Sequence, residues 1–242
     1  MYHTHPYYAA ENATRGAARG DFYDARMERL EHWNGGVGTL LGVGFSDGGY
    51  ALAAAQARGW KVVGVECSRI LVEHARTQLG LDVRSSPEWE LSGFRGSVFD
   101  AVYSHNMEHV LDPRGILRQC RSLLKEDGLL LLEVPNQFYA LKDKVKRLMY
   151  FFMGSRARRY LFTEVAPEFH TYFFDPHSIR KVLASEGFEI LEFRTYLRGH
   201  PTYLTNPLAG WLQEAVYAIG GLLERGPCIE VLARPRNSSA GD

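Results

Sequence analysis

The sequence is short of several features that would assign a protein to a class at once. Its three cysteines, Cys67, Cys120 and Cys228, are widely spaced and odd in number, which favours reduced thiols over a disulfide framework. Basic and acidic residues balance at 28 each, so the net charge predicts neither a nucleic acid nor a membrane surface as partner. No apolar run reaches the roughly 18 residues of a membrane span. Because residues 1–16 also lack a basic-then-apolar signal, we expect a cytoplasmic protein without stable membrane insertion.

The chain does contain enough apolar residues for one large core. Its 242 residues and 45% apolar composition predict a single domain over 1–242. We expect an N-terminal cap over 1–35 and two lid-like helical insertions, 138–175 and 198–226. Each insertion has an amphipathic pattern, which suits packing on the core, a lid over a substrate pocket or a dimer face.

Alternating strand and helix patterns predict the fold class. The strand candidates are short runs of aliphatic and aromatic residues, typical of strands buried on both faces. Helices are predicted to start at Ser68, at Asp112 and at Asp175, the last two each followed by proline. This order predicts an α/β fold with a doubly wound sheet and right-handed crossovers. The predicted strands are Thr39–Val43, Lys61–Glu66, Phe99–Ser104, Leu129–Val134, Phe188–Arg194 and Cys228–Pro235, with a weaker candidate at 81–86.

A glycine cluster between the first two predicted strands indicates a cofactor loop. Glycines at a strand-to-helix turn let the backbone approach a ligand, and here they are Gly42, Gly44, Gly48 and Gly49. Glu66 ends the second strand, where a carboxylate binds ribose hydroxyls. A dinucleotide fingerprint needs a third glycine at the place of Asp47, whose charge would repel a pyrophosphate. The loop therefore favours a ribose-bearing cofactor without phosphates.

Ordered motifs over residues 38–195 resemble class I S-adenosylmethionine-dependent methyltransferases of the branch that acts on small molecules. LLGVGFSDGGY resembles the glycine motif of that family, and VVGVE its second motif. SVFDAVYSHNMEHVLDPRG and HTYFFDPHSIRKVLASEGFEI resemble later segments. The resemblance implies a mostly parallel, seven-stranded, Rossmann-like sheet in which the last strand, CIEVLARP, lies antiparallel beside the fifth. It also implies S-adenosylmethionine as cofactor and a sugar, a phenolic or quinone-like ring, or a secondary metabolite as methyl acceptor.

The glycine motif departs from the family pattern at three places. Gly42 stands where the family commonly has an acid that helps hold the methionine ammonium, Phe45 where it has a small residue, and Ser46 where it has its second glycine. Asp47 could replace the missing carboxylate, which we treat as a hypothesis. The resemblance assigns cofactor contacts to Gly44, Phe45, Ser46, Asp47, Gly48, Glu66, Cys67, Ser104 and His105.

Histidines after the fourth strand raise the question of a metal. HNMEH, residues 105–109, matches the HxxEH zinc motif of inverted metallopeptidases. That chemistry needs both histidines on one face of a helix, whereas here the motif lies at the end of a predicted strand, shortly before the helix cap Asp112. We therefore expect no metal. Glu108 and His109 match a Glu-His pair of the family that takes part in metal binding in some quinone-modifying members, although packing is the expected role. His105 and His170 are the candidate general bases, and each also fits a structural histidine.

Two other function classes remain open at this point. A catalytically degenerate, methyltransferase-fold binding protein fits the changes at Gly42 and Ser46, and an NAD-dependent oxidoreductase is disfavoured by Asp47. The basic segment 142–159 suggests an acidic or carrier-bound acceptor, or else a solvated helix face. A homodimer through one of the insertions is also an option.

Overall fold

The protein is described by a computed structural model that covers residues 19–45, 47–86, 90–96, 98–137, 139–153, 170–196 and 207–236; within these, the side chains of 146, 149, 150, 153 and 207–214 are not described. Ser46, residues 1–18 of the predicted N-terminal cap, and residues 154–169 and 198–206 of the predicted insertions lie outside the described residues. The helices are α2 (Gly20–Asn34), α3 (Tyr50–Ala57), α4 (Arg69–Leu79), α5 (Pro113–Leu123), α6 (Leu141–Met153), α8 (Pro176–Ser185) and α9 (Pro207–Leu222). The strands are β1 (Thr39–Val43), β2 (Lys61–Glu66), β3 (Val83–Ser85), β4 (Phe99–Ser104), β5 (Leu124–Pro135), β6 (Phe188–Tyr196) and β7 (Cys228–Pro235).

The strands form one seven-stranded sheet in the order β3-β2-β1-β4-β5-β7-β6. The pairs from β3 to β5 are parallel, whereas β7 lies antiparallel between β5 and β6. The expected doubly wound, Rossmann-like sheet with an antiparallel last strand is therefore confirmed. β1, β2 and β4 have the predicted bounds. β5 is longer than predicted, because it begins directly after α5 and its first residue, Leu124, already pairs with Phe99.

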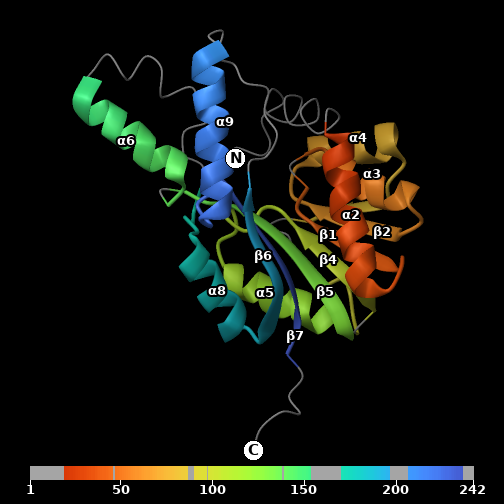
Figure 1. Ribbon diagram of the computed structural model, residues 1–242. Helices are drawn as coiled ribbons and strands as arrows, with labels where there is room; N and C mark the ends of the chain where they lie inside the picture. Colours follow the sequence, from red (N-terminus) through yellow and green to blue (C-terminus); the bar gives the residue numbers. More distant parts are fainter. Residues whose placement is uncertain are drawn as a thin grey trace, which may run out of the picture.

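Helices cover both faces of the sheet (Figure 1). Alternate residues of the central strands supply two separate cores, since successive side chains of a strand point to opposite faces. Leu41, Val102 and Leu130 face α5 and α8, while Leu40, Ala101 and Leu129 face α2, α3 and α4. Helices on both faces of the sheet explain why the central strands are nearly continuous apolar runs in the sequence.

Three helices begin as the sequence predicts. The Ser68 hydroxyl accepts a hydrogen bond from the Leu71 amide, and the Asp112 carboxylate accepts one from Gly115. Asp175 forms a capping box with Ser178 at the start of α8. These side chains satisfy amides that a helix N-terminus leaves without intrahelical partners. Because each cap depends on a few consecutive residues, these helix starts could be predicted from the sequence.

The two insertions contain α6 and α9, which extend away from the sheet beside one another at its upper edge in Figure 1. The backbone joins them at one end, where the Leu141 amide donates to the Arg225 carbonyl. This is the edge at which β1, β2, β4 and β5 end, so the insertions stand at the side of the sheet that carries the candidate site. None of the helices in the described ranges is long and apolar enough to cross a membrane.

Candidate active site at the carboxyl edge of the sheet

The predicted cofactor residues meet where the parallel strands end. Val43, the last residue of β1, pairs with Val65 on one side and with Ser104 on the other. The loops that follow β1, β2 and β4 are therefore direct neighbours. In α/β sheets ligands bind outside the carboxyl ends of the strands, at the point where the chain reverses its direction of winding. β1 and β4 form that point here, since the chain passes outward from β1 to β3 before it returns to β4.

Glu66 joins two of these loops through its side chain. One carboxylate oxygen, Oε2, accepts a hydrogen bond from the Phe45 amide at 2.9 Å. The other, Oε1, accepts from the amides of Cys67 at 2.8 Å and Ser68 at 2.9 Å. The side chain is fully buried, and burial raises the pKa of this carboxyl although the amide hydrogen bonds act in the opposite direction. Glu66 therefore fixes the geometry of the loops in addition to the role that its position at the end of β2 predicts.

The unusual glycine motif has a packing explanation. Gly42 and Gly64 are neighbours on β1 and β2. A Cβ at Gly42 would lie 2.6 Å from the Leu52 side chain, and one at Gly64 would lie 2.9 Å from the ring of Phe45. Phe45 and Leu52 are both completely buried in the core that faces α2 and α3. Gly64 thus leaves room for the large Phe45 and Gly42 leaves room for Leu52, so an acid at position 42 would collide with Leu52.

Asp47 caps the helix that follows the loop. Its Oδ1 accepts a hydrogen bond from the Gly49 amide at 2.9 Å, and its Oδ2 accepts from the Ala51 amide at 3.0 Å. Gly48 and Gly49 both have positive φ, which glycine adopts without strain. Both carboxylate oxygens thus serve the turn into α3. This arrangement gives Asp47 a local role and does not by itself supply the carboxylate missing at Gly42.

Asn106 is a site residue that the sequence analysis missed. Its amide packs against Gly44, where a Cβ would come within 2.4 Å of Nδ2, and Gly44 has φ +69°. Both polar atoms of the Asn106 side chain are buried without a hydrogen-bond partner. A buried amide of this kind is costly unless a ligand or water completes its hydrogen bonds. Its only sequence signal is its place just after β4, next to the His105 that drew attention instead.

Of the other predicted residues of this edge, Ser104 and His105 are buried and Cys67 is partly buried. Ser104 ends β4 and is almost inaccessible, and His105 directly after it places Nε2 3.6 Å from Oε1 of Glu133. Cys67 packs against the core, and burial together with the neighbouring Glu66 carboxylate raises the pKa of its thiol far above the usual range. Cys67 is therefore a neutral thiol, unsuited to act as a base or nucleophile.

A buried ionic cluster lies under His105 and ties the N-terminal helix to the last strands. The Arg26 guanidinium, on α2, contacts Glu133 of β5 at 2.6 Å and Glu230 of β7 at 2.5 Å. It also donates to the hydroxyls of Tyr103 at 2.9 Å and Tyr196 at 2.6 Å. Arg26 is completely buried, and removing a charge from water is expensive unless it is paired in this way. The cluster joins residues too far apart in sequence for any local pattern to predict.

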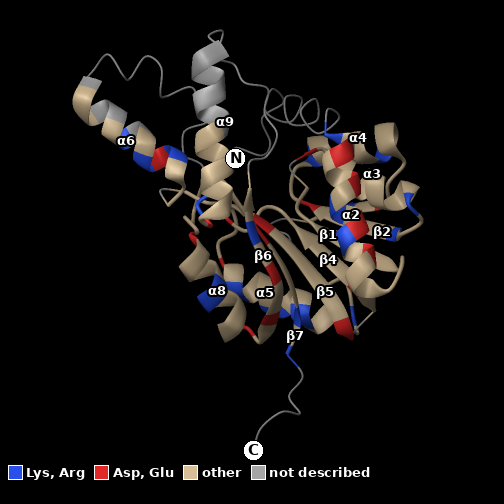
Figure 2. Ribbon diagram, viewed as in Figure 1, with Lys and Arg blue, Asp and Glu red and all other residues tan. Residues whose placement is uncertain are grey.

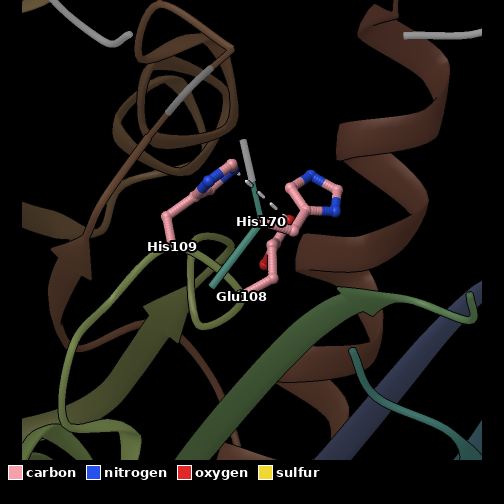
Figure 3. A group of neighbouring side chains, drawn as sticks. All are labelled: Glu108, His109 and His170. Atoms are coloured by element: carbon pink, nitrogen blue, oxygen red, sulfur yellow. Dashed lines mark ion pairs between the residues drawn. The ribbon is translucent and has the colours of Figure 1, made fainter. Parts of the chain in front are cut away.

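His170 comes close to the loop after β4. The amides of Thr171 and Tyr172 both donate to the Glu108 carbonyl. These two hydrogen bonds hold the segment that carries His170 beside the loop that follows β4. The rings of His109 and His170 lie 4.8 Å apart between centroids, in an edge-to-face arrangement. Figure 3 shows Glu108, His109 and His170 around one space, and their potential ligand atoms lie within 4.8 Å of one another. His105 and His170 are thus brought to the same edge of the sheet.

This group has the composition of a metal site, but its geometry also suits proton transfer. The Nδ1 atom of His170 is buried without a hydrogen-bond partner, and burial lowers the pKa of the ring. A lowered pKa keeps the imidazole neutral near pH 7, as either a general base or a metal ligand requires. The chemistry of the three residues alone does not choose between these roles.

The sheet order and the strand-end site define the class of S-adenosylmethionine-dependent methyltransferases. The solved structure of such an enzyme from Archaeoglobus fulgidus has the same fold, with a TM-score of 0.58 at 16% identity over 88% of this chain and 93% of that chain. The model of the methyltransferase domain family matches residues 15–192, which is more than half of the sequence. The chain therefore belongs to the methyltransferase domain family, and S-adenosylmethionine is its cofactor.

Curated relatives of this chain are ubiquinone biosynthesis O-methyltransferases. The one from Xanthomonas campestris is 37% identical over 97 residues, covering 37% of this chain and 41% of its own length. That from Caulobacter vibrioides is 31% identical over 157 residues, covering 61% and 58%. The chain thus matches about half the length of these relatives.

The residues of the carboxyl edge fit the cofactor. The Asn106 side chain packs directly against Gly44, and its amide has no hydrogen-bond partner. Glu66 places a carboxylate at the end of β2 and holds the two adjacent loops through backbone amides. These groups suit the ribose hydroxyls and the amino-acid end of S-adenosylmethionine, which carry both donors and acceptors. Gly44, Glu66 and Asn106 are all buried.

Proposed function

We propose that this protein transfers a methyl group from S-adenosylmethionine to a hydroxyl of a small aromatic molecule, with a phenolic or quinone-like ring as the favoured acceptor. The observation that carries the proposal is the edge formed by Gly44, Glu66 and Asn106, together with the similarity to O-methyltransferases. A sugar or another secondary metabolite remains an alternative acceptor. The sequence also predicts an acidic or carrier-bound acceptor from the basic segment 142–159, and a homodimer; both stay predictions.

The cofactor when bound would supply an electrophilic methyl group, whose carbon would bond to the acceptor oxygen as its bond to sulfur breaks in line and S-adenosylhomocysteine leaves. The chain has to position the acceptor and remove its proton, which together can account for most of the rate. Glu66, Asn106, Gly48 and the loop from Gly44 to Asp47 are the proposed cofactor residues, and Ser104 lines the approach to the methionine end. The cap over 1–35 and the insertions 138–175 and 198–226 are proposed to cover the acceptor.

His170 is the favoured base, with His105 as the alternative. Burial keeps the His170 ring neutral, so its Nδ1 is available to accept the hydroxyl proton. His105 is placed beside the Glu133 carboxylate, which stabilises the imidazolium that proton transfer would create. In both cases the proton passes from the acceptor oxygen to an imidazole nitrogen as the new carbon–oxygen bond forms.

A calorimetric titration separates the proposed function from its alternatives. The purified protein is titrated with S-adenosylmethionine, S-adenosylhomocysteine and NAD, and then incubated with cofactor and a panel of catechols, hydroxyquinols and sugars. We expect binding of the first two ligands and methylation of a phenolic compound. Binding without turnover on any acceptor would favour the degenerate binding protein, and binding of NAD alone would favour the oxidoreductase.

Glu108, His109 and His170 also allow a second role for this group, as ligands of a divalent cation. The proposed base role requires no metal. We therefore expect dialysis against EDTA to leave kcat within about twofold of the untreated enzyme, well below the tens-fold to hundreds-fold losses that follow disruption of a working metal site. A larger loss that Mg²⁺ or Zn²⁺ restores would instead assign these residues to a metal.

A further inference from the structure

One face of α6 is exposed along its whole length. Lys144, Arg147, Leu148, Phe151 and Phe152 follow the spacing i, i+3, i+4, i+7 and i+8, so they share one side of the helix. Leu148, Phe151 and Phe152 are 58%, 80% and 75% exposed, and the two cations are exposed as well. The remaining described side chains of α6, such as Leu141 and Val145, are partly buried. The apolar part of this exposed α6 face, formed by Leu148, Phe151 and Phe152, is therefore distinct from the partly buried side, while the Lys144 ammonium lies 5.3 Å from the ring centroid of Tyr139.

The face is divided into a basic half and an apolar half. Figure 2 shows Lys and Arg gathered in the part of α6 nearest to α9, whereas the far end lacks colour for charge. Leu148, Phe151 and Phe152 form this far end, which Figure 1 shows extending beyond the sheet. The single acid of the helix, Asp143, is partly buried and lies one turn before Arg147, so the cations of the face outnumber the acid. A surface that contacts this face meets positive charge and large apolar side chains together.

This combination points to one kind of partner. Exposed apolar side chains are common singly, but two neighbouring phenylalanines and a leucine on one face mark an interaction site. Helices that lie in the surface of a bilayer have this pattern, with apolar side chains entering the acyl region and cations meeting lipid phosphates. Among proteins, only a strongly acidic and apolar groove would offer the same complement. A second copy of α6 would bring further cations without supplying the negative charge.

We propose that the exposed α6 face binds the surface of membranes that contain anionic lipids. Phe151 and Phe152 enter the interface, and Lys144 and Arg147 pair with phosphates beside them. The attachment is peripheral and needs no membrane-spanning helix. It also places the edge that carries Glu66 and His170 at the bilayer, although the proposal holds whatever the acceptor proves to be.

Vesicle flotation tests this assignment. The full-length protein is mixed with vesicles of phosphatidylcholine alone or with about 30 mol % phosphatidylglycerol, an anionic lipid. We expect at least tenfold stronger binding to the anionic vesicles, and a steep loss when salt rises to about 0.5 M, where charges are screened. The double variant Phe151→Ser/Phe152→Ser should lose at least tenfold on anionic vesicles. Lys144→Glu/Arg147→Glu should lower the binding to the level seen with neutral lipid.

Matched control variants distinguish a loss of vesicle binding caused by the exposed α6 face from a general effect of substitution on the protein. Val37→Ser/Val98→Ser removes two apolar side chains that are 51% and 46% exposed at the opposite edge of the sheet, and Lys61→Glu/Lys181→Glu reverses two exposed charges elsewhere. Both controls should bind vesicles as wild type does. All variants should keep their affinity for S-adenosylmethionine in calorimetry, which shows that they are folded.

Three results would overturn the proposal. The first is wild-type protein that ignores anionic vesicles. The second is binding that the control variants lose as much as the α6 variants do. The third is a dimer in sedimentation velocity that Phe151→Ser/Phe152→Ser converts to monomer while vesicle binding is absent, because the face would then be an interface between copies.

Discussion

The two halves of the sheet are built in different ways. In the half formed by β3, β2, β1 and β4, the carboxylates of Glu66 and Asp47 near the strand ends accept hydrogen bonds from nearby backbone amides. In the half formed by β5, β7 and β6, ion pairs join distant elements, and helices α6 and α9 extend outward. The first half is specified by local chemistry and the second by contacts between remote segments. After the roles proposed above, we call the first the cofactor half and the second the acceptor half.

Arg26 connects the halves, and its loss should have the largest effect on stability. Arg26→Met leaves Glu133 and Glu230 buried without their shared cation, which we expect to lower the free energy of unfolding by about 3–5 kcal/mol. Urea denaturation at pH 7 measures this. Arg29→Met is the control, since Arg29 also pairs with Glu230 but is partly exposed, and it should cost about 1 kcal/mol or less. Equal losses in the two variants would mean that the buried cluster does not join the halves.

The same cluster predicts a dependence on pH. Burial raises the pKa of Glu230, but Arg26, Arg194 and Arg29 outweigh it, so the net pKa lies below the usual value of 4.5. A carboxyl with a depressed pKa stabilises the fold above its unfolded-state pKa, and that stability is lost as pH falls through the folded value. Wild type should therefore lose stability as pH falls below 4.5, and Arg26→Met should lose less over the same range.

The acceptor half is tested by His170. We expect His170→Gln to lower kcat by about 10²-fold while the affinity for S-adenosylmethionine stays unchanged, since the side chain acts on the acceptor proton. Burial lowers the pKa of His170 from 6.5, so the wild-type kcat should decline only at pH values below 6.5, and this limb should disappear in the variant. His177→Gln, at an exposed position of α8, is the control. An unchanged profile would transfer the base role to His105.

The cofactor half is tested by Glu66. Glu66→Ala removes the acceptor of three backbone amides and the carboxylate at the end of β2, and should weaken S-adenosylmethionine binding by about 1–3 kcal/mol. Isothermal titration calorimetry measures the loss against Glu73→Ala, an exposed glutamate on α4. An affinity equal to wild type would show that the end of β2 does not contact the cofactor.

Asp47 should show the smallest effect. Asp47→Ala removes a helix cap and is expected to cost about 1 kcal/mol of stability, measured by thermal or urea unfolding. Cofactor affinity should change by less than about twofold, because the carboxylate is engaged within its own turn. A larger loss of affinity would restore the hypothesis that Asp47 replaces the acid absent at Gly42.

The features that could be predicted from the sequence depend on neighbouring residues, and those that could not depend on contacts between remote segments. The bounds of β1, β2 and β4 and the caps at Ser68, Asp112 and Asp175 could be predicted, because each depends on a few consecutive residues. The packing of Phe45 on Gly64 and of Leu52 on Gly42 was not predicted, since it depends on which side chains fill the space across two strands. The local sequence around Arg26 gave no signal, and Asn106 had only its place after β4. Their importance comes from burial, which only the folded arrangement shows.

The place of β7 also fixes the order in which the molecule can be completed. This strand follows every other described strand in sequence, yet it pairs with β5 on one side and β6 on the other, and it brings Glu230 to Arg26. During synthesis the strands of the cofactor half leave the ribosome before it, and domains commonly begin to fold as they emerge. β5 therefore remains an open sheet edge until β7 has been made. A ribosome-bound chain that stops before Cys228 would expose this edge, and the buried ionic cluster around Arg26 can be completed only after β7 has joined the sheet.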